Sequence, residues 1–238
     1  MFNKIDNNWI SFSDIMTGLM IIFMFISISY ILEVQKKQSE RDEIFKEFKE
    51  TKEALYNELN ETFLDDFQKW EVEFDKDLSI KFTNPDVLFE SGSTIIRPYF
   101  SEILESFFPR YFSILLQEKY KDKIAEIRIE GHTDKIPAPN FDKDPYIGNI
   151  ILSQLRSAEV LKFFRKMEYY SDLTGFNEER IQFWLTANGL SYGRTLDKNK
   201  QLTAISKKEV DNEFSRRVEF RIVTTSDELI KRVLKEMQ

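Results

Sequence analysis

The chain has 238 residues, a net charge of −7 at pH 7 and a hydrophobic content of 42%. This length allows one membrane helix and one domain of ordinary size, and the apolar content supports a packed core. The lack of cysteine excludes disulfides and thiol chemistry, and the single histidine leaves little material for a histidine-rich metal site or a Ser-His-Asp triad. The negative charge argues against nucleic acid as a direct partner.

Residues 1–9 are predicted to form a short polar tail, and residues 10–32 a transmembrane helix. At 1.5 Å per residue this apolar run spans about 35 Å, against about 30 Å of hydrocarbon in a bilayer. Trp9 and Tyr30 lie near its two ends, where interfacial aromatic residues concentrate. Only Lys4 precedes the run and no small-residue cleavage site follows it, so we interpret the helix as an uncleaved anchor.

Asp14 is the only charged residue in the run of residues 10–32. A carboxylate within a membrane helix costs about 2.5–3.5 kcal/mol on insertion scales. Such an acid is functional by default, most often as a proton or ion site. The alternative is that Asp14 marks the start of the helix, with its charge at the membrane interface.

The charges flanking the helix give a separate prediction of orientation. Four basic residues follow it and one precedes it: Lys36, Lys37, Arg41 and Lys46 against Lys4. The positive-inside rule then places the C-terminal domain in the cytoplasm, although the rule is weaker for a single span followed by a long domain.

Residues 33–76 are charged, contain no proline or glycine, and are predicted to form a helical stalk. Large apolar residues recur in it at steps of three, four or seven: Phe48, Leu55, Leu59, Phe63, Phe67, Trp70 and Phe74. This spacing indicates either the seam of a coiled coil or partner helix, or a helix that packs on its own domain.

Residues 77–238 are predicted to form an α/β domain with a mixed sheet and covering helices. The predicted strands cover residues 79–83, 124–130, 181–187 and 218–223. The predicted helices cover residues 98–120, 153–167 and 227–237, with Ser153 and Ser226 as N-caps of the last two. Polar loops are expected at residues 133–148 and 188–213.

The membrane segment reads WISFSDIMTGLM over residues 9–20, and Ser11, Asp14 and Gly18 fall on one helical face. It resembles the W-x-x-x-x-D-x-x-T-x-x-M run of MotB-type subunits of ion-driven motors. The resemblance implies a homodimer inside a ring of multi-span A subunits, with Asp14 as the ion-binding residue. Ser11, Thr17 and Gly18 would then line the ion pathway. The ion is H⁺ or Na⁺, since hydroxyl groups near the acid suit either, and no further cofactor is implied.

Three segments of the C-terminal domain share a second resemblance. They are IRIEGHTD at 127–134, NIILSQLRSAEV at 149–160 and RRVEF at 216–220. In this order they resemble the OmpA C-terminal domain, which binds peptidoglycan. A loop at 188–195 lacks the later proline of the family, so that loop is expected to be remodelled.

This second resemblance implies a site for diaminopimelate, whose ammonium and carboxylates require an acid and a guanidinium at fixed separation. Asp134 matches the position that meets the ammonium, and Arg156 the position that meets a carboxylate. Asn149 and Leu152 match flanking positions of the groove, and Arg217 is a further candidate.

Several neighbouring residues are interpreted as structural. His132 is expected to fix local hydrogen bonds in a turn, so neither a metal site nor an enzyme is predicted. Arg216 is expected to pair with Glu130 or Glu159. Asp142 and Asp144 are expected to be solvated loop charges, which leaves them outside the proposed site.

Taken together, the motifs are most similar to those of B subunits of Zorya-type anti-phage systems. This resemblance implies a single-pass protein of the bacterial inner membrane, with a cytoplasmic N-terminus and a periplasmic C-terminal domain, and it overrides the count of flanking basic residues. Two alternatives stay open: a flagellar-type stator B subunit, and a passive tether between membrane and cell wall without ion flow.

Overall fold

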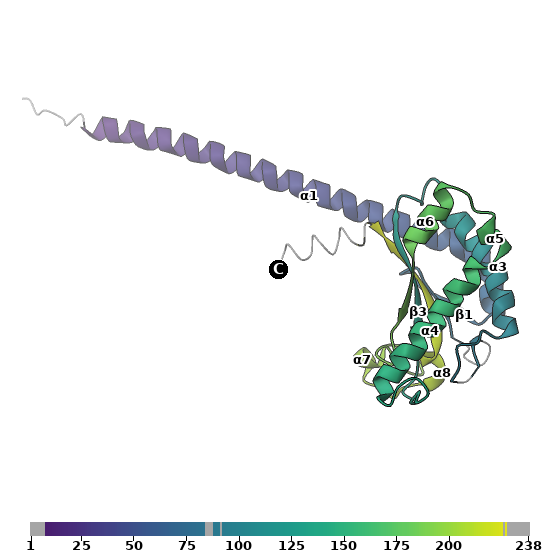
Figure 1. Cartoon of the computed structure of the whole chain (residues 1–238). Helices are drawn as coiled ribbons and strands as arrows, with labels where there is room; N and C mark the ends of the chain where they lie inside the picture. The colour runs from purple at the N-terminus through teal and green to yellow at the C-terminus, as the bar shows by residue number, and fades with distance from the viewer. Residues whose placement is uncertain (1–7, 84–87, 91, 226, 228–238) are drawn as a thin grey trace, which may run out of the picture. The chain divides into compact units, whose positions relative to one another are not determined.

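The computed structural model describes residues 8–83, 88–90, 92–225 and 227, and it divides into two compact units, Met1–Glu47 and Phe48–Gln238. Helix α1 (Asn8–Lys69) passes from the first unit into the second (Figure 1). It is the one helix in the described part of the chain that is long and apolar enough to cross a membrane. Most of the predicted tail, and the predicted C-terminal helix apart from Asp227, lie outside the described residues.

In the first unit, none of the described side chains of α1 is buried. Its described side chains from Phe12 to Glu43 are all exposed. The apolar residues of this segment surround the helix on all sides, which is typical of a helix covered by lipid or by other chains. Beyond them, charged pairs spaced four residues apart, such as Lys37 and Glu33 at 2.8 Å, stabilise an exposed helix.

In the second unit, α1 has a buried stripe with helical spacing: Leu55, Leu59 and Phe63 are fully buried. The ring of Phe63 packs 5.3 Å from that of Phe107 in α3 (Pro98–Leu115). Of the two interpretations of the apolar seam, the structure therefore shows packing on the chain's own domain. The compact unit begins at Phe48, well before the predicted boundary at residue 77.

The predicted helical stalk also ends early. Helix α1 stops at Lys69, and Glu71 adopts a positive φ of 57° that turns the chain. Strand β1 (Val72–Phe74) follows within the range where helix was expected. It pairs with the next strand, so these residues satisfy their backbone groups in the sheet.

The sheet has five strands in the order β1-β2-β5-β3-β4. The remaining strands are β2 (Ser79–Phe82), β3 (Ile124–His132), β4 (Leu185–Gly189) and β5 (Arg217–Thr224). Only the β3–β4 pair is parallel among these neighbours, so the sheet is mixed, as the sequence predicts.

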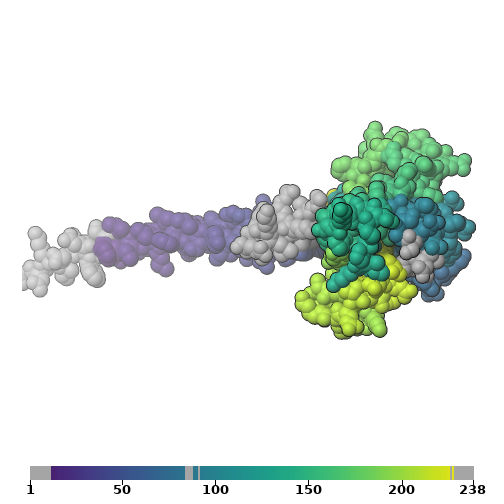
Figure 2. All heavy atoms as spheres, turned by 60° about the horizontal axis from the view of Figure 1, so that its bottom comes forward, coloured from purple at the N-terminus to yellow at the C-terminus, as the bar shows by residue number. Residues whose placement is uncertain are grey.

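Helices cover one face of this sheet, where Phe220 of β5 packs against Phe107 and Phe108 of α3. The other described helices are α4 (Pro145–Arg165), α5 (Glu168–Ser171), α6 (Phe176–Trp184), α7 (Thr203–Ser206) and α8 (Asn212–Ser215). Helix α6 lies at one end of the second unit and α7 and α8 at the other, as Figures 1 and 2 show. The predicted fold class is confirmed.

Helix α4 begins eight residues before the predicted N-cap at Ser153. The cap is Asp144, whose Oδ1 accepts hydrogen bonds from the backbone N–H groups of Tyr146 and Ile147, and Pro145 occupies the first turn. Asp144 is therefore a helix cap as well as an exposed loop charge. Ser153 is buried in the middle of the helix.

The predicted strand at residues 181–187 is helical over its first half. Ile181 and Trp184 are three residues apart on α6 and both are buried, so helix packing overrides the alternating pattern. The strand itself, β4, starts at Leu185. The predicted helix at 98–120 likewise ends at Leu115, where a chain of turns leads to β3.

Two glycines hold α4 close to the sheet. A Cβ atom on Gly131 of β3 would lie 2.3 Å from the carbonyl oxygen of Ser153, and one on Gly189 of β4 would lie 2.3 Å from the backbone nitrogen of Gln154. No larger residue fits at either position without displacement of α4. This close packing brings the first turns of α4 beside the C-terminal end of β3.

Candidate functional site

The membrane carboxylate, Asp14, lies on the exposed surface of α1 in the first unit. Nearby, Thr17 Oγ1 donates a 2.8 Å hydrogen bond to the carbonyl of Ser13, and no atom lies within 4 Å of a Cβ placed on Gly18. Ser11 belongs to the same helix, but its side chain lies outside the described part. Among the described residues, no hydrogen bond or ion pair joins Asp14 to another side chain.

A pocket of about 280 Å³ lies in the second unit. All five residues predicted to bind peptidoglycan line it: Asp134, Asn149, Leu152, Arg156 and Arg217. They come from the loop after β3, from α4 and from the start of β5, and the topology of the sheet brings these segments together. The pocket is further lined by Phe89, Ile136 and Arg216, which the sequence analysis did not assign to it.

Asp134 is the negative charge of the pocket, and its side chain is almost fully buried. Its Oδ1 accepts a 2.9 Å hydrogen bond from the backbone N–H of Ile136. Its Oδ2 accepts a 2.9 Å bond from Nη1 of Arg216. The expectation that Arg216 pairs with Glu130 or Glu159 is therefore wrong, because the chain leaving α8 directs this side chain to the pocket.

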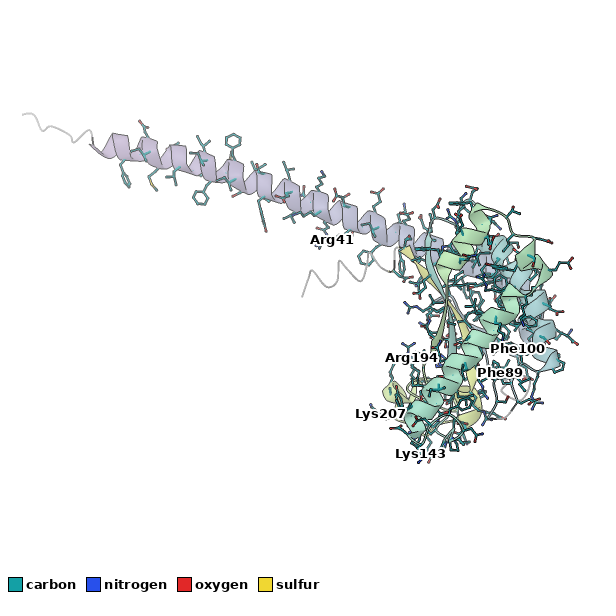
Figure 3. All side chains as sticks on the ribbon, in the orientation of Figure 1. Arg41, Phe89, Phe100, Lys143, Arg194 and Lys207 are labelled. Atoms are coloured by element: carbon teal, nitrogen blue, oxygen red, sulfur yellow. The ribbon has the colours of Figure 1, made fainter. Side chains whose placement is uncertain are left out.

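Arg156 is held in the pocket without a carboxylate partner among the described residues. Its Nε donates a 2.8 Å bond to the carbonyl of Ser93, and its Nη2 a 3.3 Å bond to the carbonyl of Glu90. The guanidinium lies over the ring of Phe89, 5.0 Å from its centroid. Phe89 in turn contacts Phe100, and Figure 3 labels both of these residues. Two of its five N–H groups bond to the described residues, and the other N–H groups are of the type that binds an anion.

The pKa of Arg156 is lowered to about 10, mainly by burial and then by the positive charge of Arg216, while Asp134 acts in the opposite direction. Arg156 remains protonated at neutral pH, since its pKa stays about three units above 7. The pocket therefore combines a fixed carboxylate with a charged, partly unsatisfied guanidinium. This pair can bind a ligand that carries both an anion and a cation.

Asn149 and Leu152 shape the pocket. The side-chain amide of Asn149 donates to the carbonyls of Ile136 and Pro145 at 2.9 and 3.0 Å, which ties the loop after β3 to the first turn of α4. Leu152 is 5% exposed, one turn along the same helix. We infer that Asn149 fixes the loop that carries Asp134, whereas Leu152 supplies an apolar wall.

Arg217 reaches the pocket edge but bonds mainly away from it. Its Nε lies 3.2 Å from Oε2 of Glu219, and its Nη1 donates to the carbonyl of Arg194 at 3.2 Å. Burial lowers the pKa of Arg217, and the charge of Glu219 counteracts this effect. Among the predicted site residues, Arg217 thus has the most complete set of partners within its own domain.

His132 is the last residue of β3 and does not lie in a turn, which corrects its predicted setting. Its Nε2 lies 3.4 Å from Oε2 of Glu219 and 3.7 Å from Oε2 of Glu130. These carboxylate partners differ from the sequence expectation, in which His132 has no clear carboxylate partner. Glu130 and His132 are two residues apart on β3, so their side chains lie on the same face of the sheet. The position of Glu219 opposite Glu130 depends on the register of β3 and β5.

Ligand-type atoms of Glu130, His132 and Glu219 lie within 4.8 Å of one another, a spacing that can hold a metal ion. Arginines already bond these carboxylates, with Arg194 at 3.3 Å from Glu130 and Arg217 at 3.2 Å from Glu219. A metal ion there would be repelled by these adjacent guanidinium groups. We therefore interpret the cluster as a buried charge network.

The mixed sheet, the covering helices and the pocket at the end of β3 define a MotB/OmpA-like domain. A putative MotB-like protein from Desulfovibrio vulgaris has the same fold, with a TM-score of 0.50, 23% identity, and coverage of 75% of this chain and 98% of that one. The periplasmic domain of Helicobacter pylori MotB (residues 78–256) is a more distant match, with a TM-score of 0.40, 18% identity, and coverage of 67% of this chain and 85% of that one.

The sequence gives the finer assignment. The chain is 36% identical over 234 residues to the Zorya protein ZorB of Escherichia coli, covering 97% of this chain and 94% of that protein. No protein-family model matches the chain. The chain belongs to the ZorB family, and its C-terminal domain has the fold of the MotB-like protein described above.

Proposed function

We propose that this chain is the B subunit of an ion-driven rotary motor of the bacterial inner membrane that acts in anti-phage defence. In this proposal two copies anchor to peptidoglycan inside a ring of multi-span A subunits, with the N-terminus in the cytoplasm and the C-terminal domain in the periplasm. The similarity to a protein named for the Zorya system supports defence over motility.

The observation that carries the wall-anchoring part is the convergence of five residues on one pocket. They were selected on sequence motifs far apart in the chain, and the fold brings them together. In the proposed complex, Arg156 binds a carboxylate of diaminopimelate and Asp134 attracts its ammonium. Each oxygen of Asp134 has a second lone pair beyond the bond described above, so the acid can still accept.

Sedimentation with purified peptidoglycan tests this site in the full chain in detergent. The double variant Arg156→Ala/Asp134→Ala is expected to lose most of its binding, because it lacks both charged partners of the ligand. The matched control is Arg128→Ala, which removes an arginine paired with Glu126 at 2.7 Å outside the pocket and should sediment like the unmodified protein. Unchanged binding by the double variant excludes these residues from the ligand site.

The ion-carrying part of the proposal rests on Asp14 within the apolar run of residues 10–32. A carboxyl group can be neutral in apolar surroundings and ionised when it faces water, so alternating exposure lets it take up and release a cation. One elementary charge gains about 2.3 kcal/mol per 100 mV of membrane potential. Ion passage at Asp14 would thus supply the work that turns the ring.

Asp14→Asn tests this step because it keeps side-chain size but removes the titratable oxygen. We expect complete loss of phage protection, measured by plating efficiency, with normal recovery of the protein in the membrane fraction. Glu33→Gln is the matched control, since it removes the next carboxylate along α1 and should retain protection. Full protection by Asp14→Asn would leave a passive tether as the better description.

A further inference from the structure

Residues 198–208 form a basic segment that includes helix α7. The segment contains four lysines and no acidic residue, in a chain whose net charge is −7. All four lysines are exposed: Lys198, Lys200, Lys207 and Lys208. None of them lines the wall pocket, so the proposed binding of peptidoglycan there does not account for this concentration of positive charge.

The basic segment is held in a defined conformation by the residues that precede it. Oδ1 of Asp197 accepts hydrogen bonds of 2.8 and 3.0 Å from the backbone N–H groups of Asn199 and Gln201. The hydroxyl groups of Thr195 and Thr203 share a hydrogen bond of 2.6 Å. The lysines therefore extend from an ordered backbone, which reduces the entropy lost when a partner binds.

Lys207 stands where glycine is the usual residue. It follows α7 in the left-handed conformation, with φ 58° and ψ 17°. A residue with a Cβ atom adopts this conformation at a cost of about 1–2 kcal/mol, which glycine avoids at the end of a helix. A lysine at this position keeps a positive charge on the surface at a cost in stability, as expected where the charge has a role.

The lysines differ in how far the domain itself neutralises them. Lys200 pairs with Glu73 and lies 4.7 Å from the centroid of the Phe214 ring. Lys198 and Lys207, in contrast, form no ion pair with any residue that the structure describes. These two lysines are therefore the ones available to an anionic partner.

The basic segment is joined to the strand end that lines the wall pocket. Ser215 directly precedes Arg216, which lines the pocket. The Ser215 hydroxyl accepts a 2.9 Å bond from the backbone N–H of Leu196, just before the basic segment. Figure 3 labels Lys207 at the same end of the second unit as Lys143, which precedes α4. One extended polymer can therefore contact both the pocket and the basic segment.

We propose that the basic segment is a second contact with the cell wall, in which Lys198 and Lys207 bind peptide carboxylates of the wall polymer outside the pocket. This inference rests on the proposed wall-binding function. The polymer repeats its peptides along each strand, and the peptides carry carboxylates, so further anionic groups lie within reach of a domain that has bound one of them. Exposed pairs of lysine and carboxylate are individually weak, but they add to the affinity of a linked site.

Salt-dependent sedimentation of the full chain in detergent with purified sacculi separates this surface from the pocket. Lys198→Gln/Lys207→Gln should bind about threefold more weakly than the unmodified protein at about 0.1 M salt. At about 1 M salt the two proteins should bind equally, because exposed charges are screened far more than buried ones. The matched control, Lys76→Gln/Lys166→Gln, removes two exposed lysines that do not line the pocket and should bind like the unmodified protein.

Two further measurements test the chemistry of the contact. Lys198→Arg/Lys207→Arg keeps both charges and should retain full binding at about 0.1 M salt. Sacculi whose free carboxylates have been converted to amides lack the proposed partners, so the unmodified protein and the double glutamine variant should bind them equally. A remaining advantage of the unmodified protein on amidated sacculi would assign the lysines to another group and overturn the proposal.

The outcomes distinguish this inference from the wall-binding function. If the unmodified protein sediments with sacculi at neither salt concentration, the wall-binding function itself fails. If it sediments but the double glutamine variant binds equally well at low salt, or the control variant loses as much, the basic segment has no role while the pocket stands. A deficit of the glutamine variant that persists at high salt also overturns the proposal, because the contact is then not electrostatic.

Discussion

The two halves of helix α1 have opposite surroundings. From Phe12 to Glu43 the described side chains are exposed, whereas Leu55, Leu59 and Phe63 in the second half are fully buried by the chain's own domain. Both halves are rich in large apolar residues. The difference lies in their arrangement, since the apolar run of the first half, which ends at Leu32, covers every side of the helix, whereas the second half has one apolar stripe.

This comparison separates what the chain completes alone from what it needs other molecules to complete. The second half of α1 is part of a finished hydrophobic core, with Phe63 against Phe107. The first half exposes residues such as Leu19 at 49% and Phe23 at 63%, and lipid or neighbouring helices must cover them. Variants in the two halves should therefore affect different properties.

Phe63→Ala should have the largest effect on stability. Removal of this fully buried ring leaves a cavity in an aromatic cluster, and the free energy of unfolding should fall by about 3–5 kcal/mol. Leu19→Ala in the exposed half should change the free energy of unfolding by less than about 0.5 kcal/mol. Urea unfolding of both variants can be followed by fluorescence of the buried Trp70 and Trp184. Equal midpoints for the two variants would contradict the packing of the second half.

Gly131→Ala should have the next largest effect on stability. Its Cβ would lie 2.3 Å from the backbone of Ser153, and this overpacking should lower the free energy of unfolding by about 1–3 kcal/mol. Gly18→Ala is the counterpart in the exposed half, where no atom lies within 4 Å of the new Cβ. We expect no change in the urea midpoint for it. A stable Gly131→Ala would show that α4 can move away from β3, and the same titration would detect this.

The sequence was sufficient for strands and motifs that carry strong local signals. β3 and β5 alternate apolar and polar residues, and both lie where the pattern places them. The five candidate residues of the pocket could be selected because fixed motifs contain them, and they share one pocket in the structure. Whether they bind peptidoglycan stays a prediction.

Features that depend on contacts between residues far apart in the sequence cannot be predicted from local sequence patterns. Composition places the domain boundary at residue 77, but Leu55 and Phe63 join the core through α3, which no local pattern reveals. The start of α4 is not evident from the sequence, because its cap, Asp144, lies in a polar segment with the composition of a loop. The partner of Arg216 depends on how α8 directs the chain across the end of the sheet.

Acid should destabilise the second unit through its buried carboxylates. Burial acts to raise the pKa of Glu219, but its contacts with His132 and Arg217 outweigh this effect and hold the pKa well below the usual value. A depressed folded-state pKa adds stability above the unfolded pKa of about 4.5, and this stability is lost as the pH falls further. For one such group, the free energy of unfolding changes by up to about 1.4 kcal/mol per pH unit.

Urea midpoints measured between pH 6 and pH 3 test this expectation. The unmodified chain should lose stability steadily below about pH 4.5. Glu219→Gln is expected to be less stable at pH 6, because Arg217 loses its charged partner, and to show a shallower decline on acidification. An identical decline in the variant would show that other carboxylates dominate acid unfolding. The pKa of Glu130 is lowered as well, so part of the slope should remain.

Glu33→Gln should have the smallest effect, and the reason sharpens the comparison. The pair of Glu33 and Lys37 is as short as the pair of Asp134 and Arg216, at 2.8 Å against 2.9 Å. Both partners of the first pair are more than 60% exposed, whereas Asp134 is 5% exposed. Solvent and salt screen an exposed pair, so the urea midpoint should not change measurably. A clear loss of stability in the isolated chain would mean that separation, and not burial, sets the strength of these pairs.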